Sequence, residues 1–151
     1  MTIERAERNP QTILGLREVV PMTAFQEFFG RAFGAVAADL GRQGSAPAGP
    51  PVALYRGPVT TTVDVTAGFP VGQPVTPGPG LVTATLPGGS TVETVHTGSY
   101  DSLPATYAEV TSWIAAQGLT PWQEMWEEYL VGPDAEPDPS RWQTRIVFPV
   151  R

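Results

Sequence analysis

The chain contains an internal repeat, and this repeat is the feature that most restricts how it can fold. Two candidate helix-capping residues, Thr23 and Ser102, lie 79 positions apart (102 − 23 = 79). The tripeptide Phe-Pro-Val recurs at the same offset, at residues 69–71 and 148–150. Residues 55–58 also echo residues 129–133, since both segments begin with Tyr and end with Gly-Pro. We therefore expect two copies of one unit, packed about a pseudo-twofold axis.

The first copy is predicted to form a strand, a helix and two further strands. The strand covers residues 11–20, and a helix follows that Thr23 caps, with Gln26 in capping-box spacing. The later strands cover residues 52–55 and 60–67. Apolar residues at helical spacing predict a core-facing stripe on the helix: Phe25, Phe29, Phe33, Val36 and Leu40.

The second half opens with a strand at residues 81–86 and then repeats this order, with a strand at 90–97, a helix at 102–117, and strands at 122–130 and 141–150. The sequence thus predicts an α+β fold of tandem β-α-β-β units. These units would form an antiparallel sheet with two main helices and a central cleft. One domain is expected over residues 1–151, with repeats at about 11–71 and 81–151.

Composition excludes several classes of function. The net charge is −6, and the nine basic residues, all Arg, are scattered along the chain, which argues against a nucleic-acid partner. The chain has no cysteine and one histidine, so we expect neither a disulfide nor a metal centre, and no motif indicates a cofactor. We also expect no membrane partner, because no apolar run is long enough to span a bilayer, and a cytoplasmic location.

The segment Trp-Gln-Glu-Met-Trp-Glu-Glu-Tyr-Leu at residues 122–130 combines aromatic residues with three acids. In a strand, Met125, Glu127 and Tyr129 share one face, and Glu124 and Glu128 share the other. Because one face packs inward, at least one carboxylate is drawn toward an aromatic interior, where it is costly without a partner. A cation supplied by a ligand would satisfy it, although the pattern leaves open whether Glu127 or Glu128 is the inward acid.

Other aromatic residues allow two interpretations. Trp113, Tyr107 and Phe33 lie on the expected helices, where they could pack in the core or line a cleft between the two halves. Trp142 alternates with the apolar residues of the last strand and is expected to be buried or to line the cleft. His96 lies near Ser99 and Asp101, but residues within one turn rarely attain the geometry of a catalytic triad.

The sequence resembles the GyrI-like small-molecule-binding domains, which also occur as effector-binding domains of AraC-type and MerR-type multidrug-responsive regulators. Its matching motifs are Pro-Gly-Gly at residues 87–89, His-Thr-Gly-Ser-Tyr-Asp-Ser-Leu at 96–103, Trp-Ile-Ala-Ala-Gln-Gly at 113–118, Trp-Glu-Glu-Tyr-Leu at 126–130 and Thr-Arg-Ile-Val-Phe-Pro-Val at 144–150. The match is strongest from about residue 81 to the end, and over the first half it is a match of pattern only.

The resemblance implies an aromatic cleft with one functional glutamate two positions before a strand tyrosine, which here is Glu127 before Tyr129. It also implies that Trp142, on the last strand, contributes to the pocket. Glu128 departs from the family pattern, in which this position is usually apolar. We expect a stand-alone member, since no basic helix-turn-helix segment precedes the domain.

We therefore expect a protein that binds bulky, hydrophobic, cationic small molecules for multidrug binding, sensing or sequestration. Glu127 would supply the charge, and Tyr129, Trp142, Trp113, Tyr107 and Phe33 would supply aromatic surface. The resemblance also implies two alternatives. One is a hydrolase of cyclopropane-containing genotoxic natural products, as some stand-alone relatives are, in which Glu127 would activate water and Tyr129 would donate a hydrogen bond. The other is a protein inhibitor of DNA gyrase, the role of the family's namesake. The sequence leaves the enzymatic question and the oligomeric state open.

Overall fold

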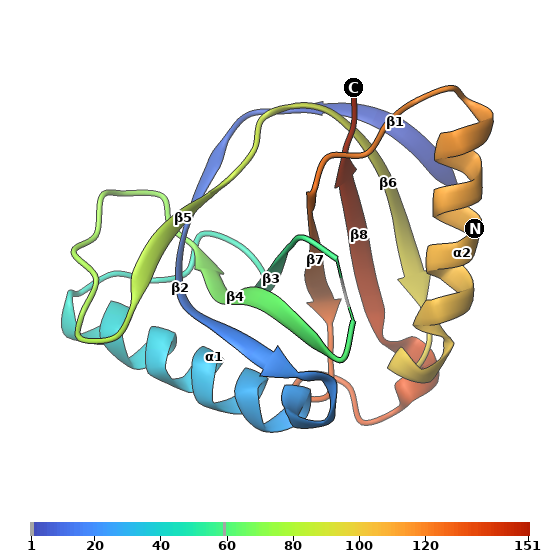
Figure 1. Cartoon of the computed structure of the whole chain (residues 1–151). Coiled ribbons are helices and arrows are strands. Elements are labelled where there is room, and N and C mark those ends of the chain that lie inside the picture. Colours follow the sequence, from blue (N-terminus) through green and yellow to red (C-terminus); the bar gives the residue numbers. More distant parts are fainter. Residues whose placement is uncertain (1, 59) are drawn as a thin grey trace.

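The computed structural model describes residues 2–58 and 60–151 as one curled antiparallel sheet with two main helices (Figure 1). The strands are β1 (Ile3–Arg8), β2 (Gln11–Pro21), β3 (Val52–Arg56), β4 (Thr62–Pro70), β5 (Val82–Leu86), β6 (Gly89–Thr97), β7 (Glu124–Val131) and β8 (Gln143–Pro149). The helices are α1 (Phe25–Arg42) and α2 (Leu103–Ala116), with short 3₁₀ turns at Met22–Ala24, Tyr100–Ser102 and Pro139–Arg141. The predicted α+β class with two main helices is confirmed.

The order of the strands is symmetrical about the centre of the sheet. It runs β1-β6-β8-β7-β3-β4-β2-β5, so that the central pair, β7 and β3, come from equivalent positions in the two halves. Each half supplies strand, strand, helix, strand, strand, and its first strand pairs with the other half: β1 with β6, and β5 with β2. The two halves are therefore interlocked through their outer strands.

Strand β1 is an element that the sequence did not indicate. Its residues are mostly polar, and only Ile3, Ala6 and Arg8 are partly buried. It lies at the edge of the sheet and pairs with one neighbour, β6, from Ile3 opposite Thr94 to Arg8 opposite Gly89. An edge strand with few buried side chains gives little hydrophobic alternation, which is why the segment was not recognised.

The expected details of the helix starts are wrong. Helix α1 begins at Phe25 after a 3₁₀ turn, and Thr23 does not cap it. Ser102 occupies the cap position of α2, but its side chain makes no capping hydrogen bond and donates to the Ser99 carbonyl instead. The cap is one turn earlier, where the Ser99 hydroxyl accepts a hydrogen bond from the Asp101 N–H at 3.0 Å.

The core-facing stripe of α1 is also shifted from the predicted one. Phe28, Ala32, Val36 and Leu40 are the buried apolar residues, whereas Phe25, Phe29 and Phe33 are only partly buried. Ala32 is small and lets the helix approach the sheet closely. The three partly buried phenylalanines lie along the side of the helix, next to this buried stripe, and form a sideways row. This sideways row brings α1 into contact with the centre of the sheet.

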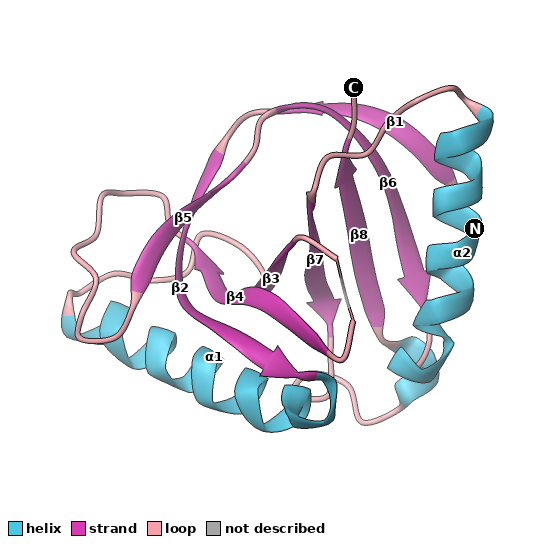
Figure 2. Cartoon of the chain, viewed as in Figure 1, coloured by secondary structure: helices cyan, strands magenta, loops and turns pink. Residues whose placement is uncertain are grey.

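Both helices pack on the same face of the sheet. Glu127 on β7 pairs with Ala53 on β3 and with Ile146 on β8, and directly paired residues point to the same face. Ala53 belongs to the cluster under α1, and Ile146 belongs to the cluster under α2. Glu127 therefore lies on the helix-bearing face, and Figure 2 shows its strand, β7, between the two helices.

The opposite face carries no helix and has its own apolar core. Trp126 is buried there against residues from both halves: Ile13, Val52, Leu54, Leu86 and Val147. Since this cluster joins β5, at one edge, to β8, beyond the centre, the sheet curls toward its helix-free face. No helix in the described residues is long and apolar enough to cross a membrane.

Candidate functional site

The Glu127 carboxylate is buried at the centre of the sheet and accepts hydrogen bonds from three tyrosine hydroxyls. Glu127 is only 5% exposed. Tyr129, on the same strand, donates at 2.6 Å, and Tyr55, on the neighbouring strand β3, donates at 3.1 Å. Tyr107 reaches the other carboxylate oxygen from α2. Two strands and a helix thus converge on one acid.

The environment of Glu127 keeps these tyrosines protonated. Burial, followed by the nearby negative charge of Glu127, raises the pKa of Tyr55, Tyr107 and Tyr129 well above the usual value. A protonated phenol donates its hydrogen bond, so all three hydroxyls are directed at the carboxylate. The site is therefore an acid held by neutral donors.

Aromatic rings from α1 surround this group. The ring of Phe25 lies 6.3 Å from that of Tyr55, and the rings of Phe29 and Phe33 lie 6.1 and 6.2 Å from that of Tyr129. These separations are in the range of edge-to-face and tilted aromatic pairs. The sideways row of α1 thus forms an apolar wall beside the carboxylate.

A second group of rings closes the site near the end of β7. Tyr100 packs on Tyr129 with a ring separation of 6.1 Å and on Trp142 with a separation of 4.9 Å. The Trp142 indole N–H donates to the Glu136 carbonyl at 2.7 Å, which ties this ring to the loop before β8. Trp142 therefore adjoins the tyrosine cluster through Tyr100, without a hydrogen bond to Glu127.

Glu128, the next residue, has the opposite kind of environment. It lies on the helix-free face, where its carboxylate accepts hydrogen bonds from Arg8 and Arg145, both at 2.8 Å. The indole N–H of Trp126 adds a third bond at 2.9 Å. Both acids are buried, but Glu128 has two guanidinium partners, whereas the hydrogen bonds recorded for Glu127 in the described residues come from tyrosines.

The structure brings together most of the residues that the sequence singled out. Glu127, Tyr129, Tyr107 and Phe33 form one cluster, and Trp142 lies at its margin. Trp113 packs against the apolar cluster between α2 and β8, which Tyr107 also contacts, but in the described residues no hydrogen bond or aromatic ring pair joins Trp113 to the Glu127 group. The roles of these residues in binding stay a prediction.

Sequence reasoning missed four aromatic residues of the cluster: Phe25, Phe29, Tyr55 and Tyr100. The repeat contained a signal for Tyr55, because this residue corresponds to Tyr129 in the other half. The helical spacing predicts Phe25 and Phe29 in the core stripe of α1, whereas in the structure they lie beside it. Tyr100 carried no signal of periodicity, since it lies in a 3₁₀ turn.

His96 is a structural residue that links β6 to the start of α2. Its ring is buried, with Nδ1 2.7 Å from the Thr106 hydroxyl and Nε2 3.0 Å from the Ser102 hydroxyl. Nε2 also lies 3.1 Å from the Ser99 carbonyl. Asp101 takes no part in these contacts, so the three residues do not form a triad.

One hydroxyl near the cluster has no partner. Thr144 is fully buried on β8, paired with Tyr129 on one side and His96 on the other, and so points to the helix-bearing face. Its Oγ1 has no hydrogen-bond partner in the part of the chain that the structure describes. Residues 2–58 and 60–151, which the structure describes, contain no group of three potential metal ligands.

Two hollows lined by described residues lie on the helix-free side of the sheet. One is about 440 Å³ and is lined in part by Arg56, Trp122 and Glu124; the other, about 270 Å³, is lined in part by Trp126 and Glu128. Glu127 lines neither of them. The aromatic rings around Glu127 are packed against one another, so the central cleft expected there stays a prediction.

The fold described above is that of a class of small-molecule-binding domain. The chain belongs to the GyrI-like family, whose model, described as a GyrI-like small molecule binding domain, matches residues 1–151. A comparison with curated proteins found no match.

Solved structures confirm the fold. The C-terminal domain of EcmrR is similar over 99% of this chain and 97% of its own, with 20% identity and a TM-score of 0.84. The chain spans 57% of the EcmrR chain in a transcription complex with DNA, at 19% identity and a TM-score of 0.84. The protein SAV2435, solved with tetraphenylphosphonium, is similar over 100% of this chain and 94% of its own, with 15% identity and a TM-score of 0.72.

Proposed function

We propose that this domain binds bulky, hydrophobic, cationic small molecules over Glu127, and that it serves in multidrug binding, sensing or sequestration. The observation that carries the proposal is the contrast between two adjacent buried acids. Glu128 has the positive charge of Arg8 and Arg145 beside it, while Glu127 has three phenols. A buried negative charge without a cationic neighbour is stabilised when a ligand brings one.

The surrounding rings select the kind of cation. Faces of tyrosine and phenylalanine attract a cation by about 0.5–2 kcal/mol each, depending on how far it is desolvated. A small, strongly hydrated ion would lose too much hydration energy among these rings. A large ion with delocalised charge loses little, and its apolar surface gains from burial beside Phe29, Phe33 and Tyr129.

Binding requires the rings over Glu127 to move. We propose that the rings of Tyr100 and Trp142 move away first, because both residues are partly exposed and lie at the margin of the cluster. Phe28 and Ala32 stay in place in the core below. A site assembled from ring faces and one charge imposes few directional demands, which favours a range of ligands over a single one.

The solved relative with tetraphenylphosphonium supports this choice, since that ligand is a bulky aromatic cation. Tetraphenylphosphonium is also a suitable probe, because its binding can be compared with that of triphenylphosphine oxide, a neutral molecule with similar rings. The proposal predicts that the protein prefers the cation, and that charge at residue 127 is the cause of this preference.

Isothermal titration calorimetry with both probes tests the proposal. In Glu127→Gln, affinity for tetraphenylphosphonium should fall about 10- to 100-fold, while affinity for the neutral oxide stays the same. Glu124→Gln is the matched control, since Glu124 lies on the same strand but on the helix-free face with Arg56. Equal losses for both probes, or no preference in the natural protein, would show that charge complementarity is not the basis of binding.

The same site has the groups needed for a hydrolase, which is the second candidate. In that function Glu127 would be the general base, and the Tyr55, Tyr107 and Tyr129 hydroxyls would donate hydrogen bonds to a developing oxyanion. A solved relative described as a hydrolase from Listeria innocua is similar over 99% of this chain, with 15% identity and a TM-score of 0.66. Chromatography of recovered ligands separates the two functions, because binding alone returns them unchanged.

A further inference from the structure

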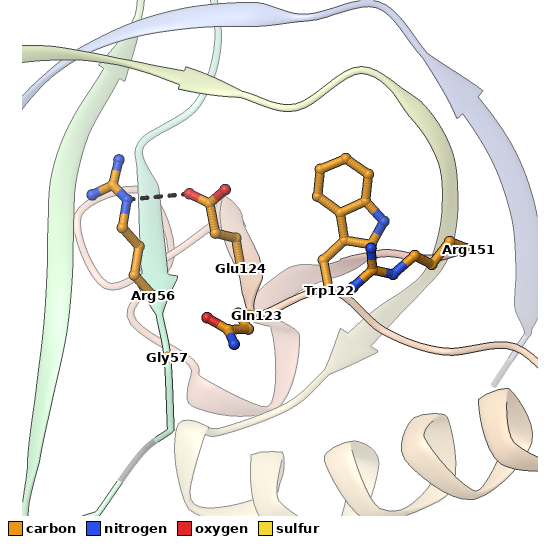
Figure 3. Close-up of a pocket in the computed structure, with 6 residues that line it drawn as sticks. All are labelled: Arg56, Gly57, Trp122, Gln123, Glu124 and Arg151. Atoms are coloured by element: carbon orange, nitrogen blue, oxygen red, sulfur yellow. Dashed lines mark hydrogen bonds and ion pairs between the residues drawn. The ribbon is translucent and has the colours of Figure 1, made fainter.

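The larger hollow lies on the helix-free face, away from Glu127. Its volume is about 440 Å³, within the range of small-molecule sites. It is lined by Arg56, Gly57, Trp122, Gln123, Glu124 and Arg151. Figure 3 shows the Arg56–Glu124 pair on one side of the hollow, and Trp122 with Arg151 on the other.

Trp122 is unusual because it is large, apolar and 40% exposed at the edge of this hollow. Tryptophan is well buried on average, and an exposed ring bordering a concavity is typical of a binding surface. Its backbone is fixed, since its N–H donates to the Pro149 carbonyl at 2.9 Å. The ring is therefore presented from a rigid position beside the end of the sheet.

The polar groups of the hollow are mainly donors without acceptors. The Trp122 indole N–H, the Gln123 amide and the Arg151 guanidinium have no hydrogen-bond partner recorded among residues 2–58 and 60–151. The one lining side chain with a carboxylate, Glu124, already accepts a hydrogen bond from Arg56 at 3.1 Å. Arg56 is held a second time, since its Nη1 donates to the Thr66 hydroxyl at 2.9 Å.

The side chains around the hollow carry one net positive charge. The Arg56–Glu124 pair is neutral as a unit, so the guanidinium of Arg151 is not compensated by another lining side chain. The backbone of Arg151 is anchored, because it exchanges two hydrogen bonds of 2.9 Å with Thr120. A guanidinium with free donors, carried by an anchored backbone, is suited to a carboxylate, which it binds through two parallel hydrogen bonds.

We propose that this hollow is a second binding site, which takes a planar aromatic carboxylate. The ring of the ligand stacks on Trp122, and its carboxylate binds Arg151, with the Gln123 amide as a further donor. This site has the opposite charge preference to the one at Glu127, and it lies on the other face of the same strand. It is independent of the proposed function at Glu127.

The test uses 2-naphthoate and its neutral counterpart 2-naphthamide. The indole N–H signals of the protein are followed by ¹H–¹⁵N NMR, and Trp122→Leu identifies the signal of Trp122. We expect 2-naphthoate to shift this signal in a saturable way. The affinity for 2-naphthamide should be lower by a factor of about ten or more. Arg151→Gln should weaken 2-naphthoate about tenfold, whereas Arg141→Gln, at an exposed arginine elsewhere, should leave it unchanged.

Several results would overturn this proposal: no shift of the Trp122 signal, a saturable shift at another indole only, or equal binding of the acid and the amide. An unchanged affinity in Arg151→Gln would also reject it. Glu127→Gln should leave 2-naphthoate binding intact, and tetraphenylphosphonium should not displace it. Failure at this hollow is thereby distinguished from failure at Glu127.

Discussion

The two adjacent buried acids should respond to neutralisation in opposite ways. Glu128→Gln should destabilise the fold, whereas Glu127→Gln should leave stability nearly unchanged and alter ligand binding instead. The two substitutions remove the same charge from consecutive residues, both less than a tenth exposed. Any difference between them therefore reports on their partners, two arginines in one case and three tyrosines in the other.

The expected cost of Glu128→Gln follows from its contacts. The carboxylate accepts charge-assisted hydrogen bonds from Arg8 and Arg145, each worth about 1.5–3 kcal/mol. Glutamine keeps one carbonyl acceptor, loses the other, and turns an amide donor toward a guanidinium. Water reaches both arginine side chains, which are 26% and 34% exposed, and this reduces the loss. We expect a destabilisation of about 2–4 kcal/mol, or about 5–15 °C in Tm for a chain of this size.

The expected cost of Glu127→Gln is below about 1 kcal/mol, because neutral phenols can donate to an amide carbonyl and accept from an amide N–H. Removing a buried charge that lacks a cationic neighbour also relieves a desolvation cost. Urea unfolding, followed by tryptophan fluorescence, measures both values. Equal destabilisation by the two substitutions, or a larger effect at residue 127, would refute the assignment of Glu128 as structural and Glu127 as the acid available to a ligand.

Three further predictions concern stability. Burial raises the pKa of the three tyrosines around Glu127, so they stay protonated in the folded protein, whereas the same tyrosines ionise at about pH 10 in the unfolded chain. Their contribution to stability is therefore complete below that pH, and above it the free energy of unfolding should fall by about 1.4 kcal/mol per pH unit for each tyrosine. Urea unfolding at alkaline pH measures this decrease. Thr144→Val should stabilise the protein by about 1 kcal/mol, seen as a higher Tm, because it replaces an unpartnered buried hydroxyl by a methyl group of the same shape. Phe28→Ala should cost about 3–5 kcal/mol in urea unfolding and Phe29→Ala clearly less, since only Phe28 is fully buried; equal costs would contradict the observed facing of α1.

Much of the fold could be predicted from local pattern. The repeat offset and the alternation of the strands gave the α+β class, and period two on β7 separated Glu127 from Glu128 correctly, as their opposite faces confirm. Pattern could not reveal that β1 and β5 pair with the other half, because strand exchange depends on long-range pairing and leaves no periodic signal.

The candidate site was predictable only in part. Glu127 and Tyr129 lie two positions apart on one strand, so their proximity follows from sequence alone. Tyr107 meets them from α2, 20 positions earlier in the chain, and whether a helical tyrosine turns to the core or to an acid depends on how the helix sits on the sheet. The facing of Phe28 against Phe29 was misjudged for the same reason, since both neighbours are apolar and only tertiary packing decides between them.

The symmetry of the sheet explains why the proposed ligand should carry a single positive charge. The repeat offset of Tyr55 and Tyr129 also relates Ala53 to Glu127, and these two residues are direct partners across the central strands, so the pseudo-twofold axis passes between them. An acid at both positions would place two buried carboxylates about 5 Å apart between Cβ atoms, an arrangement that would resist ionisation unless a divalent or dicationic ligand were bound. Ala53 instead leaves one carboxylate beside the axis, with a tyrosine from each half donating to it. Under the proposed function, this single carboxylate in an otherwise symmetrical sheet gives the site one negative charge, which matches the charge of a monovalent cation.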